Sequence, residues 1–359
     1  MSGLSVRGLT LARPGSRGTV PLLQDVSFSA PAGVVTAVLG AAGAGKTTLL
    51  ACVAGLVKTD SGSVLVDGTE VAARRGGRRG IGMLAPGTDL GAGRTVTAAL
   101  RVAAGRGRAE AAAEAVRLLG LEIAATRKLR ELSHGQGFAA LAAARLLVPG
   151  SVVLVDEAGE GLDDAAAEAL WCWLRADAGG GRTLVLATRR AATAMQASHL
   201  VLLRHGTVVQ AGPPCAVYAE PRDRVAALLT GPANILEGTV RQKVPGGFVW
   251  AAGGGQFRQE APPDAPVPAL ATQVMLCLRP EALLVTEPEA APSAGAGAAL
   301  NRLSGVVCEG APDGLTAVVD TKLGQLRARL PGPRGLCAGQ AVELAWSPRA
   351  AHLLMPCLA

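Results

Sequence analysis

Hydrophobic residues in the first part of the chain form short runs that predict strands and longer periodic stretches that predict helices. Apolar runs predict strands at 34–39, 63–66, 152–155, 183–187, 200–204 and 207–210, and a hairpin over 4–30 that turns near 14–18. Alanine- and leucine-rich stretches predict helices at 46–53, 97–104 and 109–119, and helices that begin near Gly135 and at Asp163-Asp164. Because strands alternate with helices, we predict a largely parallel α/β sheet.

The pattern changes near Gly231-Pro232. Short strand-like segments separated by glycine or proline then recur at 235–244, 247–252, 273–278, 303–307, 315–320, 325–330 and 341–345. This spacing is typical of a small all-β barrel or sandwich. We interpret the Ala-, Gly- and Pro-rich stretch 288–299 as a flexible excursion within it. The sequence therefore predicts an α/β domain over 1–232 and an all-β domain over 233–359.

The composition permits a large core but predicts no membrane span. Of the 359 residues 49% are hydrophobic, yet no run approaches the roughly 18 to 20 uninterrupted apolar residues that a spanning helix needs. The N-terminus lacks the apolar core of a signal peptide, so we expect the chain to stay in the cytosol. The net charge of +7 is modest. Without a clustered basic stripe and interleaved aromatic residues, we expect no nucleic acid as a partner.

The cysteines and histidines offer no metal site by their spacing. The seven cysteines include no C-x-x-C pair, which argues against a structural zinc site and a disulfide framework. We interpret the cysteines as small core residues. The four histidines show no ligand spacing either.

The segment from Gly40 to Thr48 carries the pattern G-x-x-x-x-G-K-[ST] between a predicted strand and a predicted helix. Glycines let backbone N–H groups turn inward on phosphate oxygens, and the helix N-terminus adds partial positive charge. Lys46 can then reach the β- and γ-phosphates of ATP while the Thr47 hydroxyl binds Mg²⁺. The alternative is a glycine-rich turn with an incidental lysine. The predicted ATP-binding residues are Gly40, Ala41, Ala42, Gly43, Ala44, Gly45, Lys46, Thr47 and Thr48.

An acidic pair follows the predicted strand 152–155. Asp156, at the strand end, can hold Mg²⁺ through water, and Glu157 can polarise the water that attacks the γ-phosphate. An Asp-Glu pair after a strand is common, but with a phosphate loop upstream it indicates an NTPase. We therefore predict Glu157 and Lys46 as catalytic residues, and Thr47 and Asp156 as metal ligands.

The pentapeptide Leu132-Ser133-His134-Gly135-Gln136 resembles the L-S-G-G-Q signature of the ATP-binding subunits of ABC transporters. In that family two nucleotide domains dimerise head to tail, and the signature of one closes over the γ-phosphate held by the other. The resemblance implies that Ser133, Gly135 and Gln136 contact ATP across a homo- or heterodimer. It places Asp163 in the loop after the acidic pair.

The C-terminal part resembles a subgroup of this family, the importer ATPases of the polyamine, iron(III) and sugar type. The motifs are Pro214–Pro221, Gly231–Gly238 and Leu278–Glu281, and 303–354 resembles the last repeat of a TOBE-like β-barrel. The resemblance implies a P-loop NTPase domain followed by a small all-β (OB/TOBE-like) regulatory domain. It also implies transmembrane permease subunits and an external solute-binding protein as partners, and a peripheral place on the cytoplasmic face of the cell membrane.

Several positions depart from the family pattern. Arg189 stands where the family has its switch histidine, and a permanent cation cannot exchange a proton, although it can neutralise transition-state charge. Pro86 falls where a glutamine senses Mg²⁺, and His134 replaces a signature glycine. No aromatic residue stands near Leu11–Arg13 to stack on adenine.

Two functions therefore stay open. The first is an ATP-hydrolysing importer subunit, with Arg189 as a third catalytic residue. The second is a nucleotide-binding but hydrolysis-poor subunit, regulatory or paired asymmetrically with a competent partner.

Overall fold

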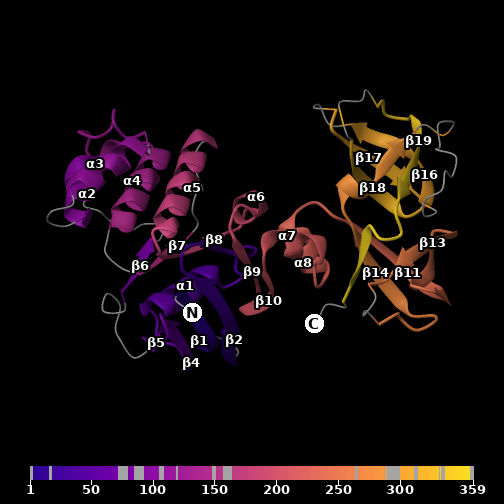
Figure 1. Ribbon diagram of the computed structural model, residues 1–359, viewed down its shortest axis with the longest axis horizontal. Helices are drawn as coiled ribbons and strands as arrows, with labels where there is room; N and C mark the ends of the chain where they lie inside the picture. The colour runs from indigo at the N-terminus through magenta and orange to yellow at the C-terminus, as the bar shows by residue number, and fades with distance from the viewer. Residues whose placement is uncertain are drawn as a thin grey trace. The chain divides into compact units, whose positions relative to one another are not determined.

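The computed structural model describes residues 3–15, 18–71, 80–84, 93–104, 109–118, 120–147, 151–156, 164–262, 266–286, 288, 300–310, 314–330, 332 and 336–355 (Figure 1). The chain divides into two compact units, 1–215 and 216–359. The predicted domain boundary at 232 lies later in the chain. The difference covers the short segment 216–232, whose backbone is bound by a side chain of the second unit, as described below.

In the first unit the strands are β1 (Gly3–Gly15), β2 (Gly18–Pro31), β3 (Val35–Leu39), β4 (Ser61–Val66), β5 (Thr69–Glu70), β6 (Ile81–Leu84), β7 (Val152–Asp156), β8 (Thr183–Thr188), β9 (His199–Arg204) and β10 (Thr207–Gly212). The helices are α1 (Lys46–Ala54), α2 (Val96–Ala104), α3 (Ala109–Leu118), η2 (Leu129–Glu131), α4 (His134–Leu147), α5 (Asp164–Gly179) and α6 (Ala191–Ala194), followed by α7 (Pro214–Ala219) at the boundary.

A six-stranded sheet forms the centre of this unit, in the order β10-β9-β3-β8-β7-β6. All neighbours run parallel except β9 and β10, which form a hairpin. Every residue of β3, β7 and β8 is buried. Parallel strands covered on both faces are continuous hydrophobic runs, which is why the sequence pattern predicted these strands.

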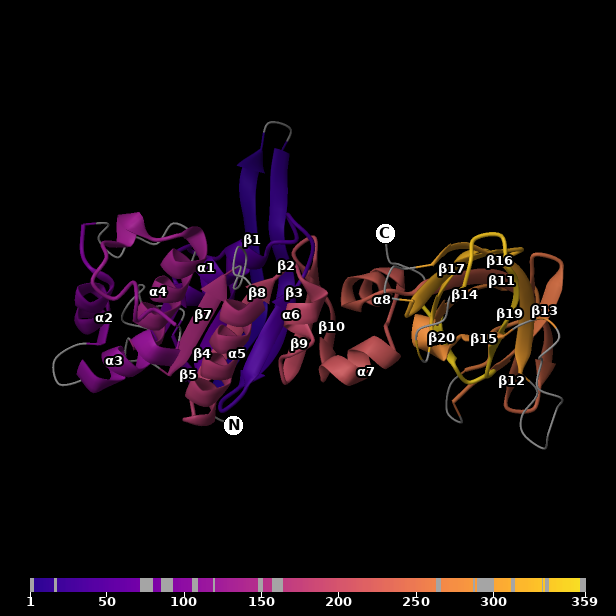
Figure 2. The same ribbon diagram turned by 90° about the horizontal axis from the view of Figure 1, so that it is seen from above.

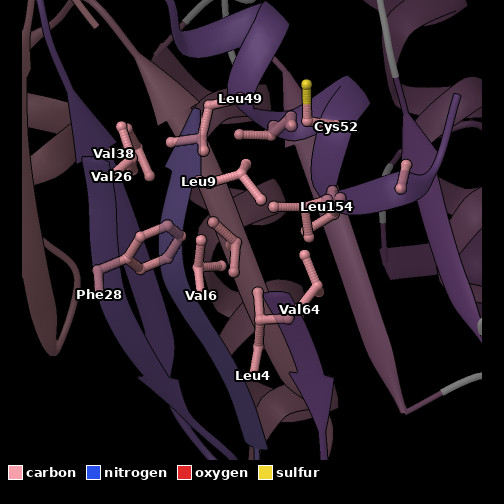
Figure 3. Close-up of a cluster of buried hydrophobic side chains, with 14 of the residues drawn as sticks. Leu4, Val6, Leu9, Val26, Phe28, Val38, Leu49, Cys52, Val64 and Leu154 are labelled. Carbon is pink, nitrogen blue, oxygen red and sulfur yellow. The ribbon is translucent and has the colours of Figure 1, made fainter. Parts of the chain in front are cut away.

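A second sheet, β2-β1-β4-β5, is antiparallel and packs over α1. Figure 3 shows the core between them, where Leu9 and Phe28 of this sheet lie with Leu49 of α1 and Val38 of β3. Leu154 of β7 belongs to the same cluster. The core therefore joins both sheets through the helix that follows the phosphate loop.

Helices α2, α3 and α4 pack against one another and form a group at one end of the unit, with α5 beside α4 (Figures 1 and 2). Trp171 of α5 is 4% exposed and belongs to the core of this unit. The guanidinium of Arg175 lies 5.6 Å from its ring centroid.

In the second unit the helices are α8 (Arg224–Thr230) and η3 (Pro280–Ala282). The strands are β11 (Asn234–Val244), β12 (Gly247–Ala252), β13 (Gly255–Glu260), β14 (Gln273–Leu278), β15 (Leu284–Thr286), β16 (Asn301–Gly310), β17 (Thr316–Thr321), β18 (Gly324–Arg329), β19 (Ala341–Trp346) and β20 (Ala351–Leu354).

These strands form two antiparallel sheets, β13-β12-β11-β14-β20 and β15-β19-β16-β17-β18. Side chains of both sheets form one hydrophobic core. At its centre the Phe257 ring lies 5.0 Å from Trp250 and 5.3 Å from Trp346, measured between centroids. The predicted all-β fold is confirmed, and among the described strands of this unit the sequence pattern missed only β13, β15 and β20.

The two sheets repeat one motif. Asn234 and Asn301 each begin the sequence N-x-L-x-G-x-V at the start of β11 and β16. The Asn234 side chain pairs with the backbone N–H and C=O of Arg327 at 2.7 and 2.8 Å, and Asn301 pairs with the backbone of Arg258 at the same distances. The last strand of each copy joins the other sheet, because β15 pairs with β19 and β20 pairs with β14.

The cysteines are not all core residues: Cys52 and Cys277 are buried, but Cys172, Cys215, Cys308 and Cys337 are exposed. The interpretation was wrong for these four because small size alone does not set which face of an element a residue occupies. The predicted excursion 288–299 lies outside the described residues, apart from Pro288.

Candidate functional site

The phosphate loop connects the buried strand β3 to α1. Gly43 and Gly45 have φ angles of 75° and 100°, which side chains rarely allow. The Ala44 N–H donates to Ala41 O at 3.2 Å, and the Leu49 N–H donates to Gly45 O at 2.8 Å. These bonds close the loop and start the helix, whose first N–H groups have no partner within an α-helix. A helix end of this kind can bind an anion.

Lys46 is the first residue of α1 and is only 6% exposed. Its ammonium donates to Gly40 O at 2.8 Å and to Ala41 O at 2.9 Å. A buried cation needs such acceptors, and here they are carbonyls of the loop itself. The structure therefore holds the Lys46 charge on the loop to which the sequence assigned it.

Gly40 begins the loop in tight contact with the sheet. A Cβ on Gly40 would lie 2.5 Å from Leu203 O and 2.9 Å from the Ala44 Cβ. Only glycine fits there without a shift of the backbone. Along the same loop Ala41, Ala42 and Gly43 are exposed, so small residues leave the loop open on that side.

Asp156 lies at the same edge of the sheet as the loop. It ends β7 and pairs with Ala187 of β8, while Thr188 pairs with Leu39, the last residue of β3. Asp156 is 1% exposed. Because the carboxyl ends of parallel strands share one edge, the predicted metal ligand lies two strands from the loop. Thr47, the other predicted ligand, is exposed.

Thr188 links the edge of the sheet to the start of the loop. Its carbonyl accepts a hydrogen bond from the Gly40 N–H at 3.3 Å, and its hydroxyl accepts one from the Arg190 N–H at 3.1 Å. Arg189 follows directly and is exposed. Arg189, the predicted catalytic cation, therefore lies directly after β8, which pairs with the strand β3 that precedes the phosphate loop.

The signature pentapeptide forms the N-terminus of α4. The Ser133 hydroxyl accepts a hydrogen bond from the Gln136 N–H, and the Gln136 side chain accepts one from the Ser133 N–H, both at 3.3 Å. This reciprocal pair is a capping box. The S-x-x-Q spacing could have indicated it, although the resemblance implied only ATP contacts for Ser133, Gly135 and Gln136.

Four residues singled out in the sequence are not fully described. Glu157, Asp163 and Pro86 lie outside the described residues, as does the side chain of His134. The signature residues lie on a different element from the phosphate loop, and no contact with the loop is among those found in the described part of the chain. Their predicted roles remain predictions.

Two parts of the sequence match known protein families. Residues 23–160 match the ABC transporter family, and residues 276–354 match the TOBE domain. The sulfate/thiosulfate import ATP-binding protein of Burkholderia mallei is 36% identical over 246 residues, which cover 65% of this chain and 70% of that protein. The Fe(3+) ions import ATP-binding protein of Mesorhizobium japonicum is 33% identical over 266 residues, which cover 69% of each chain. The chain belongs to the ABC transporter family.

Solved structures of ATP-binding cassettes have a fold similar to that of this chain. The ATP binding subunit of an ABC transporter matches with a TM-score of 0.53 and 25% identity, over 60% of this chain and 92% of that one. A dimeric ATP-binding cassette bound to ADP and Pi matches with a TM-score of 0.54 and 21% identity, over 58% and 98%, which supports the fold alone. The relatives confirm the predicted family and importer-ATPase class. The family matches and the solved structures confirm the predicted fold class of this ABC protein.

Within the described residues of this ABC protein, no three His, Cys, Asp or Glu side chains cluster as a metal site. None of its described helices is long and apolar enough to cross a bilayer.

Proposed function

We propose that this chain is the ATPase subunit of an importer and that Mg·ATP binds at the loop 40–48. The observation that carries the proposal is the Lys46 ammonium, 6% exposed and held on the Gly40 and Ala41 carbonyls at the start of α1. The residues fit a triphosphate, because a cation, glycines with positive φ and a helix N-terminus converge on one loop.

Each residue has a distinct task in this proposal. Lys46 would bind the β- and γ-phosphates, and the loop amides would hold the phosphate oxygens. Thr47 and Asp156 would hold Mg²⁺, which neutralises the charge that develops on the phosphates. Glu157 would take a proton from the attacking water, and Arg189 would stabilise negative charge beside it.

The remaining partners follow from the relatives. Proteins named for sulfate/thiosulfate and Fe(3+) import support transmembrane permease subunits and an external solute-binding protein for this chain as well, and a place on the cytoplasmic face of the membrane. Two nucleotide domains would close on ATP, with Ser133, Gly135, Gln136 and Asp163 reaching the partner's nucleotide.

The deciding experiment measures ATP binding and turnover with the purified membrane partners. Lys46→Ala should abolish binding, whereas Lys58→Ala, which changes an exposed lysine outside the loop, should leave binding unchanged. Glu157→Gln should retain binding but lower turnover by roughly a hundredfold or more, as removal of a general base does.

A second function has specific support. Arg189, Pro86 and His134 replace residues that the family mechanism uses, and these favour a nucleotide-binding subunit with poor hydrolysis. If the wild type binds ATP but turns it over no faster than Glu157→Gln, this regulatory function replaces the enzymatic one. Higher turnover in Arg189→His would identify residue 189 as the one that limits the rate of ATP hydrolysis.

A further inference from the structure

The turn between β9 and β10, formed by His205 and Gly206, lies directly against the phosphate loop. The Gly206 N–H donates to Ala44 O at 2.9 Å, and the Gln24 N–H of β2 donates to Gly206 O at 2.8 Å. Two backbone hydrogen bonds thus connect β2, the turn and the loop. The sequence predicted the strands on either side of this turn but not its contact with the loop.

The bond to Ala44 sets the orientation of the peptide group between Ala44 and Gly45. A trans peptide is planar, and its C=O and N–H point in opposite directions. Because the Ala44 carbonyl is held on Gly206, the Gly45 N–H points away from the turn. The Ala44 N–H is itself bonded to Ala41 O. The amide of Gly45 is therefore held in one direction, as a phosphate-binding donor must be.

Only glycine at position 206 allows this approach. A Cβ there would lie 2.3 Å from Leu22 O, and the φ angle of 74° is one that side chains rarely adopt. On the loop side, a Cβ on Gly45 would lie 3.1 Å from Leu22 O and 3.5 Å from the Gly206 Cα. At both positions the nearest atom is the backbone oxygen of Leu22, which cannot move aside as the end of a flexible side chain could.

A second turn in the same unit shows that this close contact is not a requirement of the turn itself. The β4–β5 turn, Asp67-Gly68, has φ angles of 49° and 77°, against 45° and 74° for His205-Gly206. A Cβ on Gly68 would meet nothing within 4 Å. Both are two-residue turns with positive φ at each position, as hairpins prefer, but only one lies against the loop.

We propose that Gly206 is a positioning residue for nucleotide binding: through Ala44 it fixes the direction of the Gly45 amide and so sets the affinity of the loop for nucleotide phosphates. This inference rests on the proposed function of the loop and adds to it a residue that acts from a neighbouring turn.

The test compares Gly206→Ala with Gly68→Ala in the full chain. Both substitutions add a methyl group at nearly the same φ angle, so the folding cost that arises from φ is matched. The dissociation constant for Mg·ATP is measured at a temperature where circular dichroism shows both variants folded. Gly206→Ala should bind about tenfold more weakly than wild type, the range that local backbone strain produces. Gly68→Ala should stay within about twofold of wild type.

Equal affinities in the two folded variants would overturn the inference while leaving the proposed function intact. Absence of Mg·ATP binding in the wild type would instead overturn the proposed function, and the inference with it.

A measurement on the wild type covers the case in which Gly206→Ala does not fold. Amide hydrogen exchange reports local opening. Mg·ATP should slow exchange in a peptide covering 204–208 together with the loop 40–48, and should leave a peptide covering 66–70 unchanged. Protection of the loop without any at 204–208 would contradict a link between the turn and the loop.

Discussion

The guanidinium carbon of Arg279 lies 3.8 Å from the centroid of the Tyr218 ring. The same guanidinium donates to the Tyr218 carbonyl at 2.7 and 3.1 Å, and to the Ala227 and Pro232 carbonyls at 2.9 and 3.1 Å. Arg279 is 7% exposed. One side chain directly after β14 thus satisfies carbonyls at both ends of the segment 216–232, which explains why this segment belongs to the second unit.

Arg279→Lys should destabilise the second unit by roughly 3 kcal/mol, because a lysine cannot replace the fork of donors and leaves buried carbonyls unsatisfied. Chemical denaturation followed by circular dichroism measures this change. Arg224→Lys is the matched control, since Arg224 forms an exposed pair with Glu237 at 3.4 Å, and it should cost at most about 1 kcal/mol. Equal losses in the two variants would contradict the role given to Arg279.

Tyr218 is the single tyrosine of the chain, so its ionisation can be followed alone by ultraviolet absorption. Burial and the hydrogen bond from its hydroxyl to Glu281, 2.7 Å long, raise the pKa of Tyr218 to about 12. The native protein should therefore titrate near pH 12, and the unfolded chain near about pH 10.

Glu281→Gln should lower the pKa of Tyr218, because it removes the negative charge beside the hydroxyl. Between about pH 10 and about pH 12 the native state retains a Tyr218 proton that the unfolded chain has lost, so stability falls as pH rises. A native midpoint near pH 10 in the wild type would show that the hydroxyl is not held as the structure has it.

The capping box at α4 predicts a stability effect that needs no nucleotide. Ser133→Ala should lower the free energy of unfolding by about 1 kcal/mol, the usual cost of losing an N-cap, while Ser133→Thr should retain most of it. Thermal unfolding of the chain without ATP measures both. If Ser133→Ala changes only ATP binding and not stability, the cap contributes nothing and Ser133 serves the nucleotide alone.

His352 makes the second unit sensitive to acid. Burial lowers the pKa of His352, and Glu220 opposes this shift only in part. Below about pH 6.5 the unfolded chain takes up a proton more readily than the native state. Stability should therefore fall as pH falls from about 7 towards 5.

His352→Gln should reduce this slope of unfolding free energy against pH. Burial also lowers the pKa of His199 in the first unit. Part of the slope should therefore persist in His352→Gln and disappear when His199→Gln is added to it. An unchanged slope in the double variant would assign the acid sensitivity to carboxylates instead.

The sequence alone determined the strands whose residues are buried on both faces, such as β3, β7 and β8, because a continuous apolar run has few other solutions. It also determined the loop 40–48, since glycine, lysine and threonine at that spacing carry their chemistry in local order. The order of motifs along the chain was enough to indicate the family.

Tertiary structure decided what depends on distant partners. β15 and β20 are short strands that exist because each pairs with the other copy of the repeat. β13 carries mostly polar residues, and only its pairing with β12 makes it a strand. The contact of Gly206 with the loop joins residues far apart in sequence. Local periodicity records which face of an element is apolar, but not which other element lies against it, because that choice depends on how the whole chain packs.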